Sequence, residues 1–98
     1  MRDFVGEVGI KDPESKRAFQ LDYYLLKSGT QYGLEAQLFE EGKLIDSATI
    51  LGITEKASEI ELLARYYLQH EVMPVTLAYM IRDYLADPGV DKLQCVML

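Results

Sequence analysis

The chain has 98 residues, of which 49% are hydrophobic and 27% are charged, and its formal net charge is −6. These values are typical of one small globular domain, so we expect residues 1–98 to fold as a single unit. The negative charge argues against nucleic acids and anionic membranes as partners, because both select basic patches. The single cysteine, Cys95, excludes an intrachain disulfide framework. No signal peptide and no apolar run of about 18 residues is visible, so a cytoplasmic protein is expected.

Residues 4–10 are predicted to form a first strand. Phe4, Val8 and Ile10 share one parity of the alternation that marks a strand. Two glycines weaken this pattern, because glycine is depleted in strand interiors. A polar turn is expected to follow at residues 11–14.

Residues 19–40 predict a β-hairpin, because apolar side chains alternate on both sides of a tight turn. A two-residue loop of Gly29 and Thr30 places glycine where a type II′ turn requires a positive φ. A three-residue loop would mix apolar and polar side chains on each face, whereas the two-residue loop keeps them apart. The two-residue loop pairs Leu21 with Leu38, Tyr23 with Ala36 and Leu25 with Leu34.

Residues 43–51 are predicted to form a further strand, whose register the sequence leaves open. A type I turn with a glycine bulge pairs Leu38 with Leu44. The same register points Asp46 inward, opposite Ala36. A two-residue loop instead turns the other parity inward, which consists of Ile45, Ser47, Thr49 and Leu51. Neither set is uniformly apolar.

From Thr54 onward the sequence predicts an amphipathic helix. Thr54 is a suitable N-cap, and a capping box of Ser58 with Glu61 would start the helix later. The apolar positions recur at helical spacing and form a stripe that packs on a core, namely Ile60, Leu63, Ala64, Tyr67 and Leu68.

A second helix is predicted after a break at Pro74, because proline interrupts a helix interior. Thr76 is the expected cap, and the helix runs from Leu77 to about Ala86. Its inner face is expected to comprise Leu77, Met80, Ile81, Tyr84 and Leu85. The tail, residues 90–98, is apolar enough to dock as a last strand or an extended segment.

Strands grouped before helices indicate an α+β fold rather than a parallel α/β fold. We predict an antiparallel β-meander of three to four strands, followed by two helices packed on one face of the sheet. That face is expected to carry Leu21, Tyr23, Leu25, Leu34 and Ala36.

The chain shows no catalytic, metal-binding or nucleotide-binding signature, so no cofactor is expected and a non-enzymatic role is favoured. His70, the one histidine, is interpreted as a polar residue at a helix end. Cys95 is interpreted as a small apolar residue of the tail. The last four residues also match a prenylation pattern, but they lack the usual polybasic support.

The second face of the sheet is the predicted site of function. Tyr24, Leu26 and Phe39 leave that face more apolar than a solvated face requires, which is typical of protein interfaces. We therefore expect a protein partner or a homodimer there. The alternative is a small-ligand-binding protein or enzyme with a pocket between sheet and helices. Its lining would be Tyr23, Asp46, Tyr67 and Tyr84, with Asp46 as the acid or base.

From Gly52 the sequence GITEKASEIELLARYYLQHEVMPVTLAYMIRDYLAD resembles the helical half of a small uncharacterised bacterial domain family. The similar features are a Gly-x-Thr start, a Leu-Leu pair in the first helix, Val-x-Pro-Val-Thr-Leu before the second helix, and a closing Asp-x-Leu. The resemblance covers residues 52–87 and implies a bacterial cytoplasmic protein. It transfers no activity and no functional residue.

Overall fold

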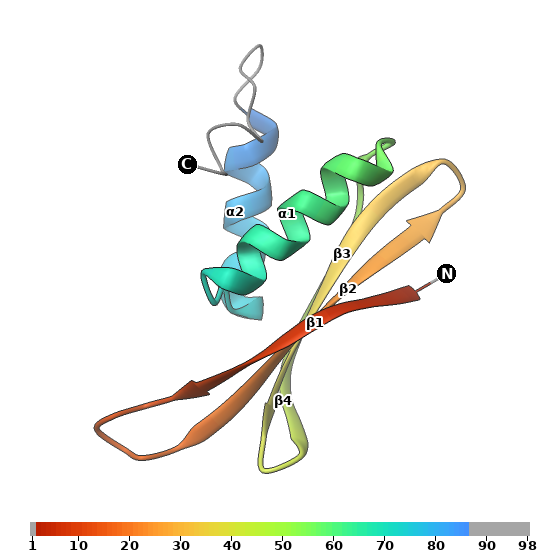
Figure 1. The fold of residues 1–98 in the computed structure, drawn as a ribbon. Helices are drawn as coiled ribbons and strands as arrows, with labels where there is room; N and C mark the ends of the chain where they lie inside the picture. The colour runs from red at the N-terminus through yellow and green to blue at the C-terminus, as the bar shows by residue number, and fades with distance from the viewer. Residues whose placement is uncertain (1, 87–98) are drawn as a thin grey trace.

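The computed structural model describes residues 2–86 and shows a sheet with two helices on one of its sides (Figure 1). The elements in chain order are β1 (Arg2–Lys11), β2 (Ala18–Ser28), β3 (Gln31–Glu40), β4 (Lys43–Thr54), α1 (Ala57–Gln69) and α2 (Pro74–Ala86). The strands lie in the order β1-β2-β3-β4 and each neighbouring pair is antiparallel. The predicted α+β meander is confirmed. The predicted turn at 87–90, the docked tail and Cys95 lie outside the described residues.

The core lies between one face of the sheet and the two helices. Leu21, Tyr23, Leu34 and Ala36 of the central strands are fully buried there, as the alternation predicted. The buried residues that the helices contribute are Ile60, Leu63, Ala64, Tyr67, Pro74, Leu77, Ile81 and Tyr84. Leu85, which was expected in this set, is half exposed on α2.

The β2–β3 hairpin has the predicted register. Leu21 pairs with Leu38, Tyr23 with Ala36 and Leu25 with Leu34. Gly29 has a φ of 62°, whereas the φ of Thr30 is not positive. A positive φ at the first central position alone is the pattern of a type II′ turn. The turn residue and the hydrophobic alternation therefore specify the same register.

The β3–β4 hairpin combines parts of both predicted registers. Glu41 and Gly42 form a two-residue loop, with φ values of 51° and 79°. Two positive φ values define a type I′ turn, whose twist matches the flanking strands, so the predicted type I turn is wrong. A bulge then leaves Ile45 without a partner and reverses the parity. As a result Ala48 and Ile50, not Thr49 and Leu51, face the helices, opposite Ala36 and Leu34.

Both helices start at positions other than those predicted. Thr54 is the last residue of β4, and the N-cap of α1 is Lys56, which makes no side-chain capping bond. Ser58 lies inside α1, so the proposed capping box does not start the helix either. Pro74 begins α2 rather than breaking a helix, because the first helical position needs no backbone N–H.

Candidate functional site

The face of the sheet opposite the helices, called the open face below, is covered by no other element in residues 2–86 (Figure 1). Cross-strand pairs place most of its residues in three rows that run across the sheet. The first row is Phe4, Tyr24, Glu35 and Thr49, the second is Glu7, Asp22, Gln37 and Ser47, and the third is Gly9, Gln20, Phe39 and Leu44.

Tyr24, the first predicted interface residue, is partly covered by β1. The Phe4 ring packs edge-on against the Tyr24 ring, with a centroid separation of 5.4 Å. The Arg2 guanidinium lies 3.7 Å from the Tyr24 ring centroid, a cation–π distance. The same guanidinium donates a hydrogen bond of 2.6 Å to Glu35 Oε1. Leu26 pairs with Arg2 at this end of the sheet, so Tyr24 and Leu26 lie near each other and are both half-buried.

Phe39, the third predicted interface residue, lies apart from the other two. It pairs with Gln20 and Leu44, whereas Tyr24 pairs with Glu35. Glu35 and Phe39 are four positions apart on β3, which corresponds to about 14 Å. The polar row that contains Asp22 crosses the sheet between them. The open face therefore has two apolar regions, at Phe4–Tyr24–Leu26 and at Phe39–Leu44, and not the single patch that was predicted.

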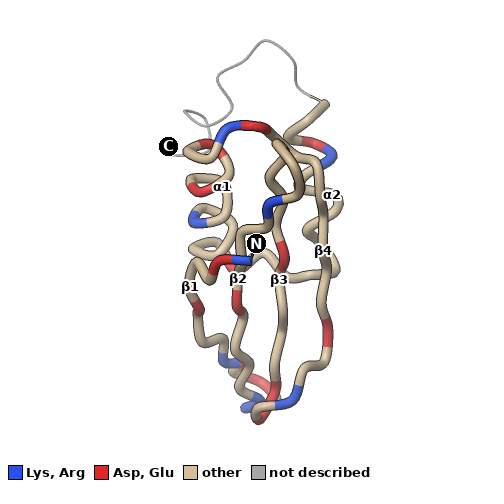
Figure 2. Tube along the Cα trace, turned by 90° about the vertical axis from the view of Figure 1, so that its right-hand side faces the viewer, with Lys and Arg blue, Asp and Glu red and all other residues tan. Residues whose placement is uncertain are grey.

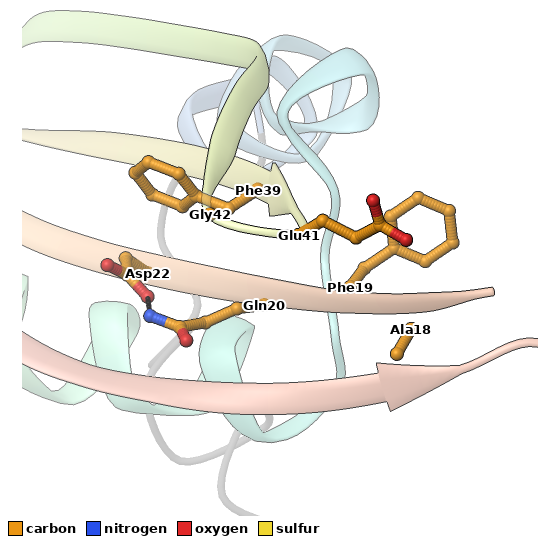
Figure 3. Close-up of a pocket in the computed structure, with 7 residues that line it drawn as sticks. All are labelled: Ala18, Phe19, Gln20, Asp22, Phe39, Glu41 and Gly42. Carbon is orange, nitrogen blue, oxygen red and sulfur yellow. Dashed lines mark hydrogen bonds between the residues drawn. The ribbon is translucent and has the colours of Figure 1, made fainter.

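A hollow of about 510 Å³ lies beside Phe39 (Figure 3). The side chain of Asp22 belongs to its lining although Asp22 is only 7% exposed. Gln20 Nε2 donates a 2.9 Å hydrogen bond to Asp22 Oδ1. The lining residues are Ala18, Phe19, Gln20, Asp22, Phe39, Glu41 and Gly42. The sequence did not predict this site, because strand alternation assigns Asp22 to a solvated face and carries no signal of its burial.

The tyrosines of the alternative pocket lie in the core, where their hydroxyl groups already have partners. Tyr23 is fully buried and donates a 2.7 Å hydrogen bond to the carbonyl oxygen of Val72. Tyr67 donates a longer bond of 3.4 Å to the carbonyl oxygen of Met80. Burial disfavours the charged phenolate, so it raises the pKa of Tyr23 well above its ordinary value and that of Tyr67 to about 12.

The other two members of the alternative pocket do not join these tyrosines in a cavity. Tyr84 donates a 2.5 Å hydrogen bond to Glu59 Oε2, and Thr54 donates to the other oxygen of the same carboxylate. Asp46 has the predicted inward parity, but it pairs with Leu38 near the β3–β4 turn and is exposed. Figure 1 shows that this turn extends beyond the helices. The structure therefore does not assemble an acid–base site from Asp46 and the core tyrosines.

His70 caps the C-terminus of α1, as expected, and its ring lies 4.3 Å from that of Tyr66. No group of three or more His, Cys, Asp or Glu side chains within residues 2–86 has the arrangement of a metal site. No helix in this part of the chain is long and apolar enough to span a membrane.

These features define a small α+β domain with one covered and one open sheet face. A family model matches residues 6–87, and the chain belongs to that family, which is described as a family of unknown function (DUF6514). The match extends the resemblance seen in the helical half to nearly the whole described chain. No curated protein and no solved structure matches the sequence.

Proposed function

We propose that the protein works through protein–protein contact and that the open face is the contact surface. The observation that carries the proposal is the uneven covering of the sheet. The helices bury one face, while Phe4 and Leu44 on the other are 56% and 51% exposed. They lie beside the half-buried rings of Tyr24 and Phe39. Exposed apolar side chains that surround aromatic residues and have a polar rim are typical of interaction surfaces.

The charge of the open face favours a different protein over a second copy. Glu7, Asp22 and Glu35 lie on this face, one each on β1, β2 and β3, and Figure 2 shows acidic positions along these strands. Arg2 compensates Glu35 only. A two-fold contact would bring the same acidic rows together, and like charges at an interface oppose association. A partner with a basic surface avoids this repulsion.

A homodimer through the open face is the second form of the proposal. Its support is that the apolar regions at Phe4 and at Leu44 lie on either side of the polar row, so two copies could join apolar to apolar. The bacterial and cytoplasmic setting is also proposed, and the family resemblance supports it.

Photo-crosslinking in cells tests the contact. A photoreactive amino acid is placed at position 4 or 44 on the open face, and at position 75 as the control. Val75 is 74% exposed on α2, on the helix side of the molecule. We expect a discrete adduct from positions 4 and 44 and none of that mass from position 75. Equal adducts from all three positions, or none from positions 4 and 44, would contradict the proposal.

Light scattering after size-exclusion chromatography separates the two forms. A homodimer requires twice the chain mass at high protein concentration, and the Leu44→Ser variant should reduce that mass while Val75→Ser should not. If the wild-type chain stays monomeric at all concentrations, the homodimer is excluded and contact with a different protein is the form of the proposal that stands.

A further inference from the structure

The hollow beside Phe39 is large enough to admit a side chain of a partner. Its volume of about 510 Å³ falls within the range of about 300–1,000 Å³ that is usual for ligand sites. Figure 3 shows Gln20 and Asp22 side by side along β2, with the ring of Phe39 extending from the neighbouring strand. A polar group inside the hollow therefore lies next to an aromatic wall.

The carboxylate of Asp22 lines the hollow, and it accepts a side-chain hydrogen bond at one of its two oxygens. Asp22 is 93% buried, since 7% of it is exposed. Its Oδ1 accepts the Gln20 amide, and no other side-chain hydrogen bond or ion pair of Asp22 exists within residues 2–86. A buried carboxylate is costly unless it is paired with a cation and hydrogen-bonded. A positive group that enters the hollow would give the Asp22 carboxylate a cationic partner.

The remaining lining also favours a cation. Phe39 supplies an aromatic ring, which attracts cations, and Glu41 adds a second acidic residue. None of the lining residues is Lys or Arg. The nearby Arg17 lies 5.1 Å from the Phe19 ring centroid but is held by Glu40 in bonds of 2.7 and 2.5 Å. Arg17 therefore neutralises Glu40 and not Asp22.

We propose that this hollow receives the cationic side chain of an arginine from a protein partner. The inference rests on the proposed function and specifies the chemistry of its partner. Arginine fits better than lysine, because its planar guanidinium can stack on an aromatic ring while it donates two parallel bonds to a carboxylate. The net charge of −6 adds attraction for a basic segment over a longer distance.

The test is an NMR titration of the ¹⁵N-labelled chain with N-acetylarginine methylamide, compared with the citrulline analogue. Citrulline has nearly the same shape but no charge. For a single side chain we expect affinity on the order of millimolar, with shifts centred on residues 18–22 and 39–42. The citrulline analogue should give little or no shift there. Equal shifts from both compounds, or shifts centred elsewhere, would overturn the proposal.

Two variants separate a specific pair from general attraction. Asp22→Asn keeps the size of the side chain and should weaken arginine binding about tenfold or more, the usual effect of losing a hydrogen bond to a charged group. Glu14→Gln makes the same change of charge on an exposed residue of the β1–β2 turn and should have little effect. Equal weakening by both variants would reduce the site to non-specific electrostatics and contradict the proposal.

The outcomes also distinguish this inference from the proposed function. If a crosslinked partner binds Asp22→Asn as tightly as the wild type, the proposed protein contact is supported and the arginine site is excluded. If arginine binds specifically but positions 4 and 44 give no adduct, the hollow is supported as an arginine site and the protein contact through the open face is excluded.

Discussion

Gly33 occupies a position where no side chain can fit. β4 places three residues opposite it, because Tyr32 pairs with Thr54 while Leu34 pairs with Ile50. A Cβ atom on Gly33 would lie 2.2 Å from the carbonyl oxygen of Ile50, which is a backbone atom and cannot rotate away. Glycine here is therefore a steric requirement of the irregular β3–β4 pairing.

We expect Gly33→Ala to lower the free energy of unfolding by about 1–3 kcal/mol, the usual cost of overpacking. Gly9→Ala is the matched control, because nothing lies within 4 Å of a Cβ atom at that position. It should change the stability by less than about 0.5 kcal/mol. Urea denaturation of both variants measures the difference. Equal midpoints would show that β4 does not approach Gly33 as described.

The buried tyrosines make the stability depend on alkaline pH. In the folded chain the pKa of Tyr67 is raised to about 12, and in the unfolded chain it is about 10. The stabilisation is therefore complete below about pH 10 and is lost as pH rises toward the folded pKa, by about 1.4 kcal/mol per pH unit for each such group. Tyr23, whose pKa is also raised by burial, acts in the same direction.

Urea denaturation at about pH 9, 10 and 11 measures this loss. The Tyr67→Phe variant should lose less stability over this range than the wild type, because its position 67 cannot titrate. Tyr79→Phe, at a position that is 62% exposed, should follow the wild type. Parallel pH profiles for all three proteins would contradict the burial of Tyr67.

At the scale of elements, one carboxylate connects β4 and both helices. Glu59 on α1 accepts hydrogen bonds from Thr54 at the end of β4 and from Tyr84 on α2. Thr54 also accepts the backbone N–H of Lys56 at 3.2 Å. The start of α1 is therefore held by a residue of the preceding strand, which explains why a sequence reading takes Thr54 as the N-cap.

We expect Glu59→Ala to cost about 2 kcal/mol or more, because bonds to a charged group contribute about 1.5–3 kcal/mol. Glu61→Ala removes a neighbouring exposed carboxylate whose contact is a 3.0 Å ion pair with Arg65 one turn away. Such a pair contributes about 0.3–0.5 kcal/mol. Thermal unfolding compares the two variants, and a similar loss in both would show that Glu59 does not link the three elements.

An element could be predicted from the sequence where its local sequence signals all favoured one structure. The hairpin of β2 and β3 was predicted in detail, because Gly29 and the alternation agree. The register of β4 was not, because the bulge at Ile45 reverses parity without a glycine or proline to mark it. Pro74 was misread because proline both interrupts helices and begins them.

At the scale of the whole molecule, the two helices cover only one face of the sheet. This one-sided covering explains which part of the site could be predicted from the sequence. The sequence predicted an uncovered face with Tyr24, Leu26 and Phe39, because two helices can cover only one face and these residues alternate onto the other. The division of this face into two apolar regions could not be predicted, because it depends on which residues of neighbouring strands pair with one another. The burial of Asp22 was also unforeseen, because it depends on the residues around it, Gln20 on its own strand and Glu7 and Gln37 across from it.

The central claim is that the open face binds another protein. The most direct measurement is calorimetric titration of the crosslinked partner, once purified, with the wild-type chain and two variants. We predict that Leu44→Ser weakens binding about tenfold or more, as expected when an apolar side chain that anchors an interface is replaced by a polar one. Val75→Ser, on the helix side, should bind as the wild type does. Equal affinities for all three proteins, or a loss in Val75→Ser alone, would contradict the assignment of the open face.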